Sequence, residues 1–206
     1  MHFEFLLEEE SAEAALRFLV PKILGPEPTF RIHVFQGKRK LLANLESRLR
    51  GYASRPGNWR VVVLVDEDRE DCHAVKQELE VACLEAGLIT KTEAEPGQGF
   101  QVLNRIAIEE LEAWFFGDVH ALCTAYPGVP ATLANRAKFR VPDAIAGGTW
   151  EALEEVLQRA GYHRGGLAKI TAARDIAPHM DPNRNTSESF RCFVQGLVAA
   201  REQGAS

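Results

Sequence analysis

The feature that most constrains the fold of this chain is a short apolar run at positions 61–65, which ends abruptly in a mostly acidic run at positions 66–71. A run of aliphatic, mostly β-branched residues this short is typical of a strand buried on both faces, as in parallel sheets covered by helices. Ligands of open α/β sheets bind outside the carboxyl ends of the strands. The acidic residues follow that end, so we expect the functional edge of the molecule there.

Composition sets the class of protein. The chain has 206 residues, of which 46% are hydrophobic and 26% are charged, as expected for one α/β domain with a small helical extension. Its net charge of -5 gives no general attraction for nucleic acid, so such binding would need a local basic patch, screening metal ions or a partner. The absence of a long apolar run and of a basic amino-terminal region predicts a cytoplasmic protein that has no membrane partner.

Four cysteines, Cys72, Cys83, Cys123 and Cys192, lie far apart in the sequence and form no CxxC pair. This spacing argues against a zinc knuckle or a redox motif, and it agrees with a reducing compartment. We expect most of the four to be core residues.

Strand and helix patterns alternate through the first half of the chain, which predicts an α/β fold with a mostly parallel sheet and helices on both faces. The expected strands are residues 3–7, 30–35, 61–65 and 101–108, and the expected helices are residues 11–24, 39–52, 70–87 and 109–116. The last of these helices is expected to continue the strand before it directly. Beyond Gly117 only helices are expected, at residues 119–125, 149–160, 167–176 and 187–202. We therefore divide the chain into an α/β domain, residues 1–117, and an α-helical extension packed on it, residues 118–206.

Acidic residues cluster just past the ends of three predicted strands, at positions 8–10, 66–71 and 109–112. If these strands are neighbours, the like charges converge on one edge of the sheet and repel by roughly a few kcal/mol, a cost that a bound cation would remove. Asp66 and Asp68 project to the same side while the chain stays extended, and Mg²⁺ prefers one or two carboxylates plus retained waters. The alternative interpretation is that each cluster complements the dipole of a following helix.

Two of these segments resemble the motifs of the Toprim domain, which is shared by topoisomerases, bacterial primases and OLD-type nucleases. Residues 6–16 are similar to its first motif, which carries a Glu after the first strand, and residues 64–68 are similar to its Asp-x-Asp motif. Glu9 stands where many Toprim domains have glycine, so we expect the turn after the first strand to be built differently.

Nearly the whole chain also resembles a bacterial family of uncharacterised Toprim-like proteins, often encoded beside ATPases. That likeness is carried by residues 33–38, 66–72, 108–114, 169–170 and 187–191. The resemblance implies a Toprim-like sheet covered by helices.

The resemblance also implies catalytic roles. Asp66 and Asp68 would hold Mg²⁺ or Mn²⁺ directly or through water, and Glu8 would be a further ligand or the general acid or base at the phosphoryl group. Glu109 and Glu112 are spaced i, i+3 on the predicted helix and would complete a second metal position. Their alternative interpretation is an acidic first helical turn.

Three consecutive cations, Lys38, Arg39 and Lys40, follow the second predicted strand. Cations at a helix amino terminus oppose the helix dipole, so this run indicates a nearby anion, such as a phosphate held together with helix amides. The alternative is a solvated surface run. Lys169 and Arg191 are further candidates for phosphate contact.

The leading functional hypothesis is Mg²⁺-dependent phosphodiester hydrolysis or phosphoryl transfer on nucleic acid. One rival is a non-catalytic or regulatory subunit that docks on an ATPase partner, and another is an enzyme of phosphoryl transfer on small nucleotides. The scarcity of base-stacking aromatic residues beside the basic run favours the two rivals. No feature distinguishes DNA from RNA.

Overall fold

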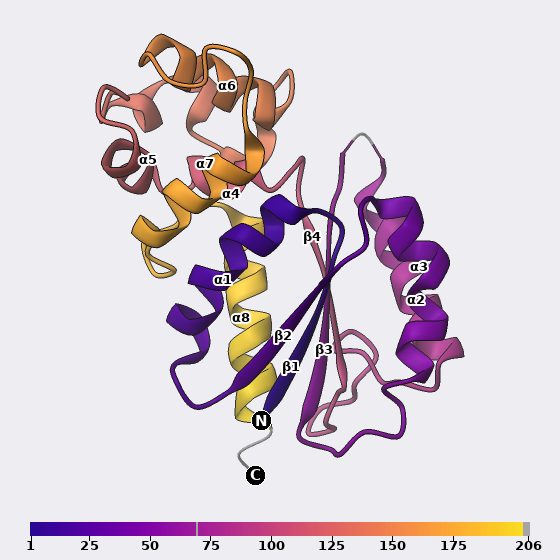
Figure 1. Ribbon diagram of the computed structural model, residues 1–206. Coiled ribbons are helices and arrows are strands. Elements are labelled where there is room, and N and C mark those ends of the chain that lie inside the picture. The colour runs from indigo at the N-terminus through magenta and orange to yellow at the C-terminus, as the bar shows by residue number, and fades with distance from the viewer. Residues whose placement is uncertain (69, 204–206) are drawn as a thin grey trace.

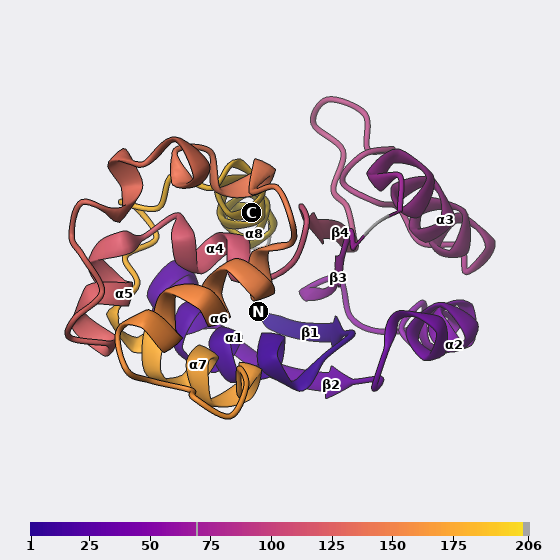
Figure 2. The same ribbon diagram turned by 90° about the horizontal axis from the view of Figure 1, so that it is seen from above.

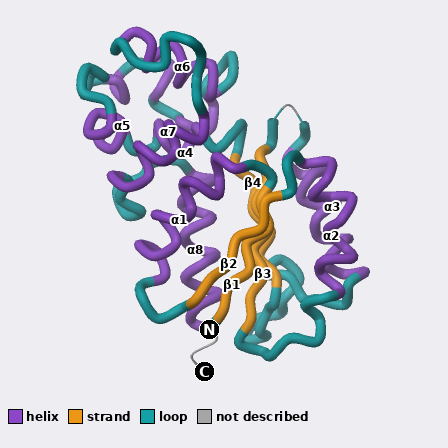
Figure 3. The backbone as a smooth tube through the Cα atoms, in the orientation of Figure 1, coloured by secondary structure: helices purple, strands orange, loops and turns teal. Residues whose placement is uncertain are grey.

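A computed structural model describes residues 1–68 and 70–203 of the chain. Within them, four strands form one parallel sheet in the order β2-β1-β3-β4, drawn in orange in Figure 3. The strands are β1 (His2–Leu7), β2 (Thr29–Val34), β3 (Trp59–Asp66) and β4 (Val102–Ala107). The predicted α/β class with a parallel sheet is confirmed.

Helices cover both faces of the sheet (Figures 1 and 2). One face carries α1 (Glu10–Leu24) and α8 (Glu188–Glu202), and the other carries α2 (Lys38–Arg50) and α3 (Cys72–Glu85). Successive side chains of a strand point to opposite faces of the sheet, so each strand contributes to the cores on both sides. Val62 and Leu64 of β3 belong to the core under α1 and α8, whereas Val61, Val63 and Val65 belong to the core under α2 and α3. The uninterrupted apolar run of β3 follows from this double burial.

The remaining helices lie on the α1 side of the sheet, toward the end at which the strands finish (Figure 1). They are α4 (Glu112–Phe116), α5 (Val119–Ala125), α6 (Thr149–Arg159) and α7 (Lys169–Ile176), with short 3-10 turns η1 (Leu133–Asn135), η2 (Ala137–Phe139), η3 (Pro142–Ala144) and η4 (Ala177–His179). Trp114 of α4 is fully buried against Phe190 and Phe193 of α8, with ring centroids 5.1 and 5.0 Å away. The helical part therefore shares the core beneath α1.

Two sequence-based expectations are wrong. The helix expected from position 109 begins only at Glu112, because Glu109 adopts a left-handed φ of 60° that no helix continues. Among the cysteines, Cys83 alone is buried, whereas Cys192 is exposed on α8. Among the described residues, no helix combines the length and the apolar character needed to cross a membrane.

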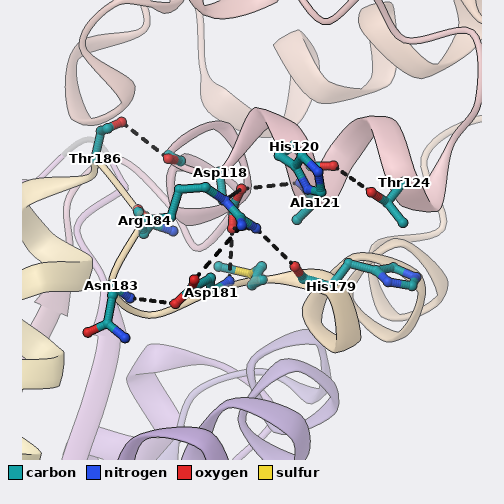
Figure 4. A network of polar contacts seen from close by, with 12 residues as sticks. Asp118, His120, Ala121, Thr124, His179, Asp181, Asn183, Arg184 and Thr186 are labelled. Atoms are coloured by element: carbon teal, nitrogen blue, oxygen red, sulfur yellow. Dashed lines mark hydrogen bonds and ion pairs between the residues drawn. The ribbon is translucent and has the colours of Figure 1, made fainter.

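A buried carboxylate ties the carboxyl-terminal helices together (Figure 4). Asp118 is 1% exposed, and its side chain caps α5 by accepting from the backbone N–H of Ala121. It also accepts from the backbone N–H of Asp181 at 2.9 Å and from two guanidinium nitrogens of Arg184 at 2.8 Å each. One side chain thus supplies a helix cap and a bidentate ion pair.

We expect Asp118→Ala to lower the free energy of unfolding by about 2 to 4 kcal/mol, because it removes a cap and leaves buried donors without an acceptor. The matched control is Glu46→Ala, which removes an exposed ion pair with Arg50 on α2 and should cost less than about 1 kcal/mol. Urea unfolding followed by circular dichroism measures both variants. Equal losses would show that the Asp118 network does not hold the helices together.

Candidate functional site

Three buried carboxylates lie where neighbouring strands finish. Glu8 follows β1, Asp66 ends β3 and Glu112 opens the helix after β4, and their exposed fractions are 8%, 8% and 1%. The strands are paired so that Leu7 is level with Leu64, and Asp66 is level with Ala107. This register brings the turns after the strands to one edge of the sheet, where the backbone N–H of Asp66 donates to Glu8 at 3.3 Å.

The turns after β3 and β4 are joined by hydrogen bonds. The N–H of Asp68 donates to the carbonyl of Glu109 at 2.8 Å, and the N–H of Glu109 donates to the Glu67 carboxylate at 2.9 Å. Asp68 and Glu109 both have left-handed φ values, 58° and 60°, which are uncommon for residues other than glycine. Such strain persists where the surroundings over-determine the backbone, as these hydrogen bonds do here.

Lys38, at the start of α2, faces this acidic turn. Its Nζ lies 2.6 Å from Asp68 and 3.4 Å from Glu70, and it donates to the carbonyl of Glu67 at 3.2 Å. Burial alone would lower the pKa of Lys38, but the hydrogen bond and charge of Asp68 raise it above the usual value. Lys38 is therefore a buried cation engaged with carboxylates.

Lys169, at the start of α7, is the second cation of the site. Its Nζ lies 4.0 Å from Glu9 and 3.9 Å from Glu112, and it stands 5.9 Å from the ring centre of Trp150. Burial opposes its charge, but Glu112 and Glu9 raise the pKa of Lys169 on balance. A residue from the carboxyl-terminal helices thus adds a cation to the acidic edge of the sheet.

The carboxylates nevertheless disfavour one another's ionisation. Burial, and then the charges of Glu112 and Glu8, raise the pKa of Asp66 well above its usual range. Burial raises the pKa of Glu112 to about 7, although Lys169 opposes the shift. Burial and the charge of Asp68 also raise the pKa of Glu8. Perturbed carboxyl groups at such an edge are typical of functional sites.

An acidic cavity of about 540 Å³ opens beside the turns that follow β3 and β4. Asp68, Glu109, Trp150 and Glu151 line it together with Glu70, Glu110 and the glycines at 147 and 148. Trp150 and Glu151 come from α6, and no sequence pattern links them to the sheet edge. The only local signal is the pair of glycines before the helix, both with left-handed φ values of 91°, which form the turn that delivers α6 to the cavity.

Most of the sequence-predicted residues meet at this edge. Glu8, Asp66, Asp68 and Glu112 are joined there by Lys38 and Lys169, and Glu109 lies on a turn that lines the cavity rather than on a helix with Glu112. Three of the residues predicted to contact phosphate do not lie at this edge. Arg39 and Lys40 are exposed on α2, and Arg191 on α8 forms its ion pair with Glu188.

The donor set suits a hard divalent cation, which binds carboxylate oxygens and water. In the described residues, no three or more His, Cys, Asp or Glu side chains are already grouped as a metal cage. Mg²⁺ does not need such a cage, because one or two carboxylates with several waters suffice. Among the described residues, Glu112 Oε2 is buried without a hydrogen-bond partner. Lys169 Nζ, 3.9 Å away, is too distant for a direct hydrogen bond, so this oxygen fits direct contact with a bound cation. Asp66, Glu112 and Glu8 are therefore the residues that could hold one.

Comparison with known proteins gives one family match. A family model described as a domain of unknown function (DUF4276) matches residues 7–198 of the chain. No curated protein and no solved structure matches it.

The raised pKa of Glu112 predicts a pH dependence of stability. The pKa of Glu112 is about 7 in the folded protein, whereas the ordinary pKa of a glutamate side chain is 4.5. The protonated carboxyl group therefore stabilises the fold fully below about pH 4.5, and this contribution is lost as the pH rises through 7. Without divalent metal, Glu112→Gln should reduce the loss of unfolding free energy between pH 5.5 and 8 by about 2 kcal/mol. Urea unfolding in EDTA at the two pH values measures this.

Glu46→Gln, an equal change at a half-exposed position on α2, should keep the wild-type difference between the two pH values. If Glu112→Gln also keeps that difference in full, Glu112 is not the group that holds the proton.

Proposed function

The chain belongs to the DUF4276 family, and from its site we propose that it is a Mg²⁺- or Mn²⁺-dependent enzyme that hydrolyses or transfers phosphodiester groups of nucleic acid. The observation that carries this proposal is the convergence of buried Glu8, Asp66 and Glu112 at one edge of a parallel sheet, where Glu112 Oε2 accepts no hydrogen bond among the described residues and Lys169 Nζ stands 3.9 Å away. The order of Glu8 and the Asp66-x-Asp68 pair, which resembles the Toprim motifs, supports the same reaction class.

The metal would be held by Asp66 and Glu112, with Glu8 or Asp68 as a further ligand, directly or through water. When bound, a divalent cation offsets charge that develops on a phosphoryl group and lowers the pKa of a bound water. It would also offset the burial and the like-charge repulsion that together raise the pKa of Asp66. Binding a cation at this negatively charged edge therefore costs less electrostatic free energy than binding it in a neutral cavity.

Glu8 is the best candidate for the general base or acid. Its pKa is raised by burial and by Asp68, which brings proton exchange at its carboxylate nearer to neutral pH. Its Oε2 accepts from the N–H of Asp66 at 3.3 Å, so the side chain is oriented by the backbone of the neighbouring strand. A group held in this way can accept or return a proton with little reorganisation.

Lys169 is the cation best placed to contact a substrate phosphate. It is 29% exposed, and its distances to Glu9 and Glu112, 4.0 and 3.9 Å, are longer than direct hydrogen bonds. Lys38 is 7% exposed and already makes a 2.6 Å contact with Asp68, so its role in the proposal is to hold the acidic turn. Trp150 supplies an aromatic face in the cavity.

The same two lysines favour a second candidate, a non-catalytic or regulatory subunit that docks on an ATPase partner. Lys38 and Lys169 offset part of the acidic charge without a metal, as expected if the edge serves as a structural or interaction surface. Metal binding and hydrolysis separate the two candidates.

We expect Mn²⁺ to stabilise the protein by about 1.4 kcal/mol at ten times its dissociation constant, a rise of roughly 3 to 6 °C in melting temperature. Asp66→Asn should abolish this shift, because it removes a ligand. Glu13→Gln is the matched control, since Glu13 on α1 is paired with Arg17, and it should keep the full shift. Differential scanning calorimetry with and without Mn²⁺ gives the result. A full shift in Asp66→Asn would place the ion elsewhere.

Purified protein with Mn²⁺ or Mg²⁺ should cleave single- or double-stranded DNA or RNA. Glu8→Gln should lower the rate by at least about a hundredfold, as expected on loss of a proton-transfer group, and Glu13→Gln should not. Cleavage is followed with end-labelled oligonucleotides on denaturing gels. Equal cleavage by wild type and Glu8→Gln would indicate a contaminating nuclease, and no cleavage despite Mn²⁺ binding would favour the regulatory candidate.

A further inference from the structure

A second cavity, of about 300 Å³, lies on the α2 side of the sheet and is lined by cations and aromatic rings. Arg31 and His33 come from β2, and Arg48 lies near the end of α2. Tyr52 and Arg55 come from the segment that leads into β3, and Trp59 is the first residue of β3. We call this the arginine cavity. It is separate from the acidic edge, because Lys38 and Arg48 stand at opposite ends of α2, about 15 Å apart along the helix.

In the part of the chain that the structure describes, its three arginines have no carboxylate partner. Within residues 1–68 and 70–203, no ion pair joins Arg31, Arg48 or Arg55 to Asp or Glu. Arg50 of the same helix is paired with Glu46, which shows that α2 can supply such a partner. Three like charges around one small cavity repel one another, and an anion between them would reverse that cost.

The single carboxylate of the cavity is already satisfied. Glu4 is 3% exposed, and it contacts His2 at 3.0 Å, His33 at 2.5 Å and the hydroxyl of Tyr52 at 3.2 Å. In the cavity wall, the Glu4 carboxylate holds these three side chains in position. His33 also lies 2.9 Å from a guanidinium nitrogen of Arg48, so a buried carboxylate holds a histidine that in turn positions an arginine.

Aromatic rings hold two of the guanidinium groups. Arg48 lies over Tyr52 at 5.6 Å from the ring centre, and Arg55 lies over Trp59 at 5.0 Å. Stacking of this kind fixes the plane of a guanidinium while its N–H edges stay available to an acceptor. Planar donors in fixed positions match the oxygens of phosphate better than those of a smaller anion.

We infer that the arginine cavity binds the phosphate group of a phosphorylated ligand. Three guanidinium charges set against the one charge of Glu4 leave an excess of about two, which matches a phosphate dianion. The volume admits a phosphate together with a small attached group. The phosphate can belong to the end of a polynucleotide or to free phosphate and small phosphorylated molecules. This inference does not depend on the proposed function, because it uses none of the residues of the acidic edge.

Isothermal titration of the full chain with inorganic phosphate tests the inference, in EDTA and at low salt, so that no metal at the acidic edge contributes. The double variant Arg31→Gln/Arg55→Gln should bind phosphate at least about tenfold more weakly, as expected on loss of charge-assisted hydrogen bonds. Their side chains make no ion pair with Asp or Glu within the described residues, and the backbone hydrogen bonds of β2 and of the turn at Arg55 do not depend on the side chains, so the fold should be kept. Arg50→Gln is the matched control and should bind like wild type.

A second titration identifies the source of the phosphate. A short single-stranded oligonucleotide is compared with and without a 5′-phosphate. If the 5′-phosphate strengthens binding and the double variant removes that gain, the ligand is a polynucleotide end. If inorganic phosphate binding depends on the arginines but the 5′-phosphate adds nothing, the ligand is a small phosphorylated molecule. No phosphate binding by wild type, or equal binding by the double variant, overturns the inference.

Discussion

The parallel, level pairing of β1, β3 and β4 is the constraint on which the rest of the structure depends. Leu7 lies level with Leu64, and Asp66 with Ala107, so the strands finish together and their following turns share one edge. β1 and β3 are buried along almost their whole length and are apolar over their final residues before the turns, so their acidic clusters stand at the strand ends. The convergence of acidic groups is thus a consequence of the register.

Much of the remaining structure offsets this convergence. α2 begins with Lys38 against the turn after β3, and α7 begins with Lys169 near Glu112. Both lysines stand at helix amino termini, where a cation is unfavourable to the helix dipole. The carboxylates outweigh that cost, because each lysine has a raised pKa despite burial. The helical part of the chain therefore contributes a charge that the sheet edge needs.

The sheet could be predicted from the sequence because its strands are short apolar runs bounded by turn residues, and the acidic clusters at their ends predicted the edge. What could not be predicted was set by contacts between distant segments. Glu109 leaves the helix because Glu67 accepts its N–H. Lys38 is partnered by an acid thirty residues away, so its neighbours in the sequence suggested a phosphate. Glu151 reaches the cavity only through the packing of α6.

The separation of charge along α2 explains how an acidic chain, with a net charge of -5, can present a surface for anions. The acidic edge lies at the amino end of α2, and the arginine cavity lies at its carboxyl end, where cations complement the helix dipole. At a separation of about 15 Å the two fields are largely screened from each other in physiological salt. The proposed ligands of the two cavities would therefore bind independently, and the proposed phosphate contact requires no overall positive charge.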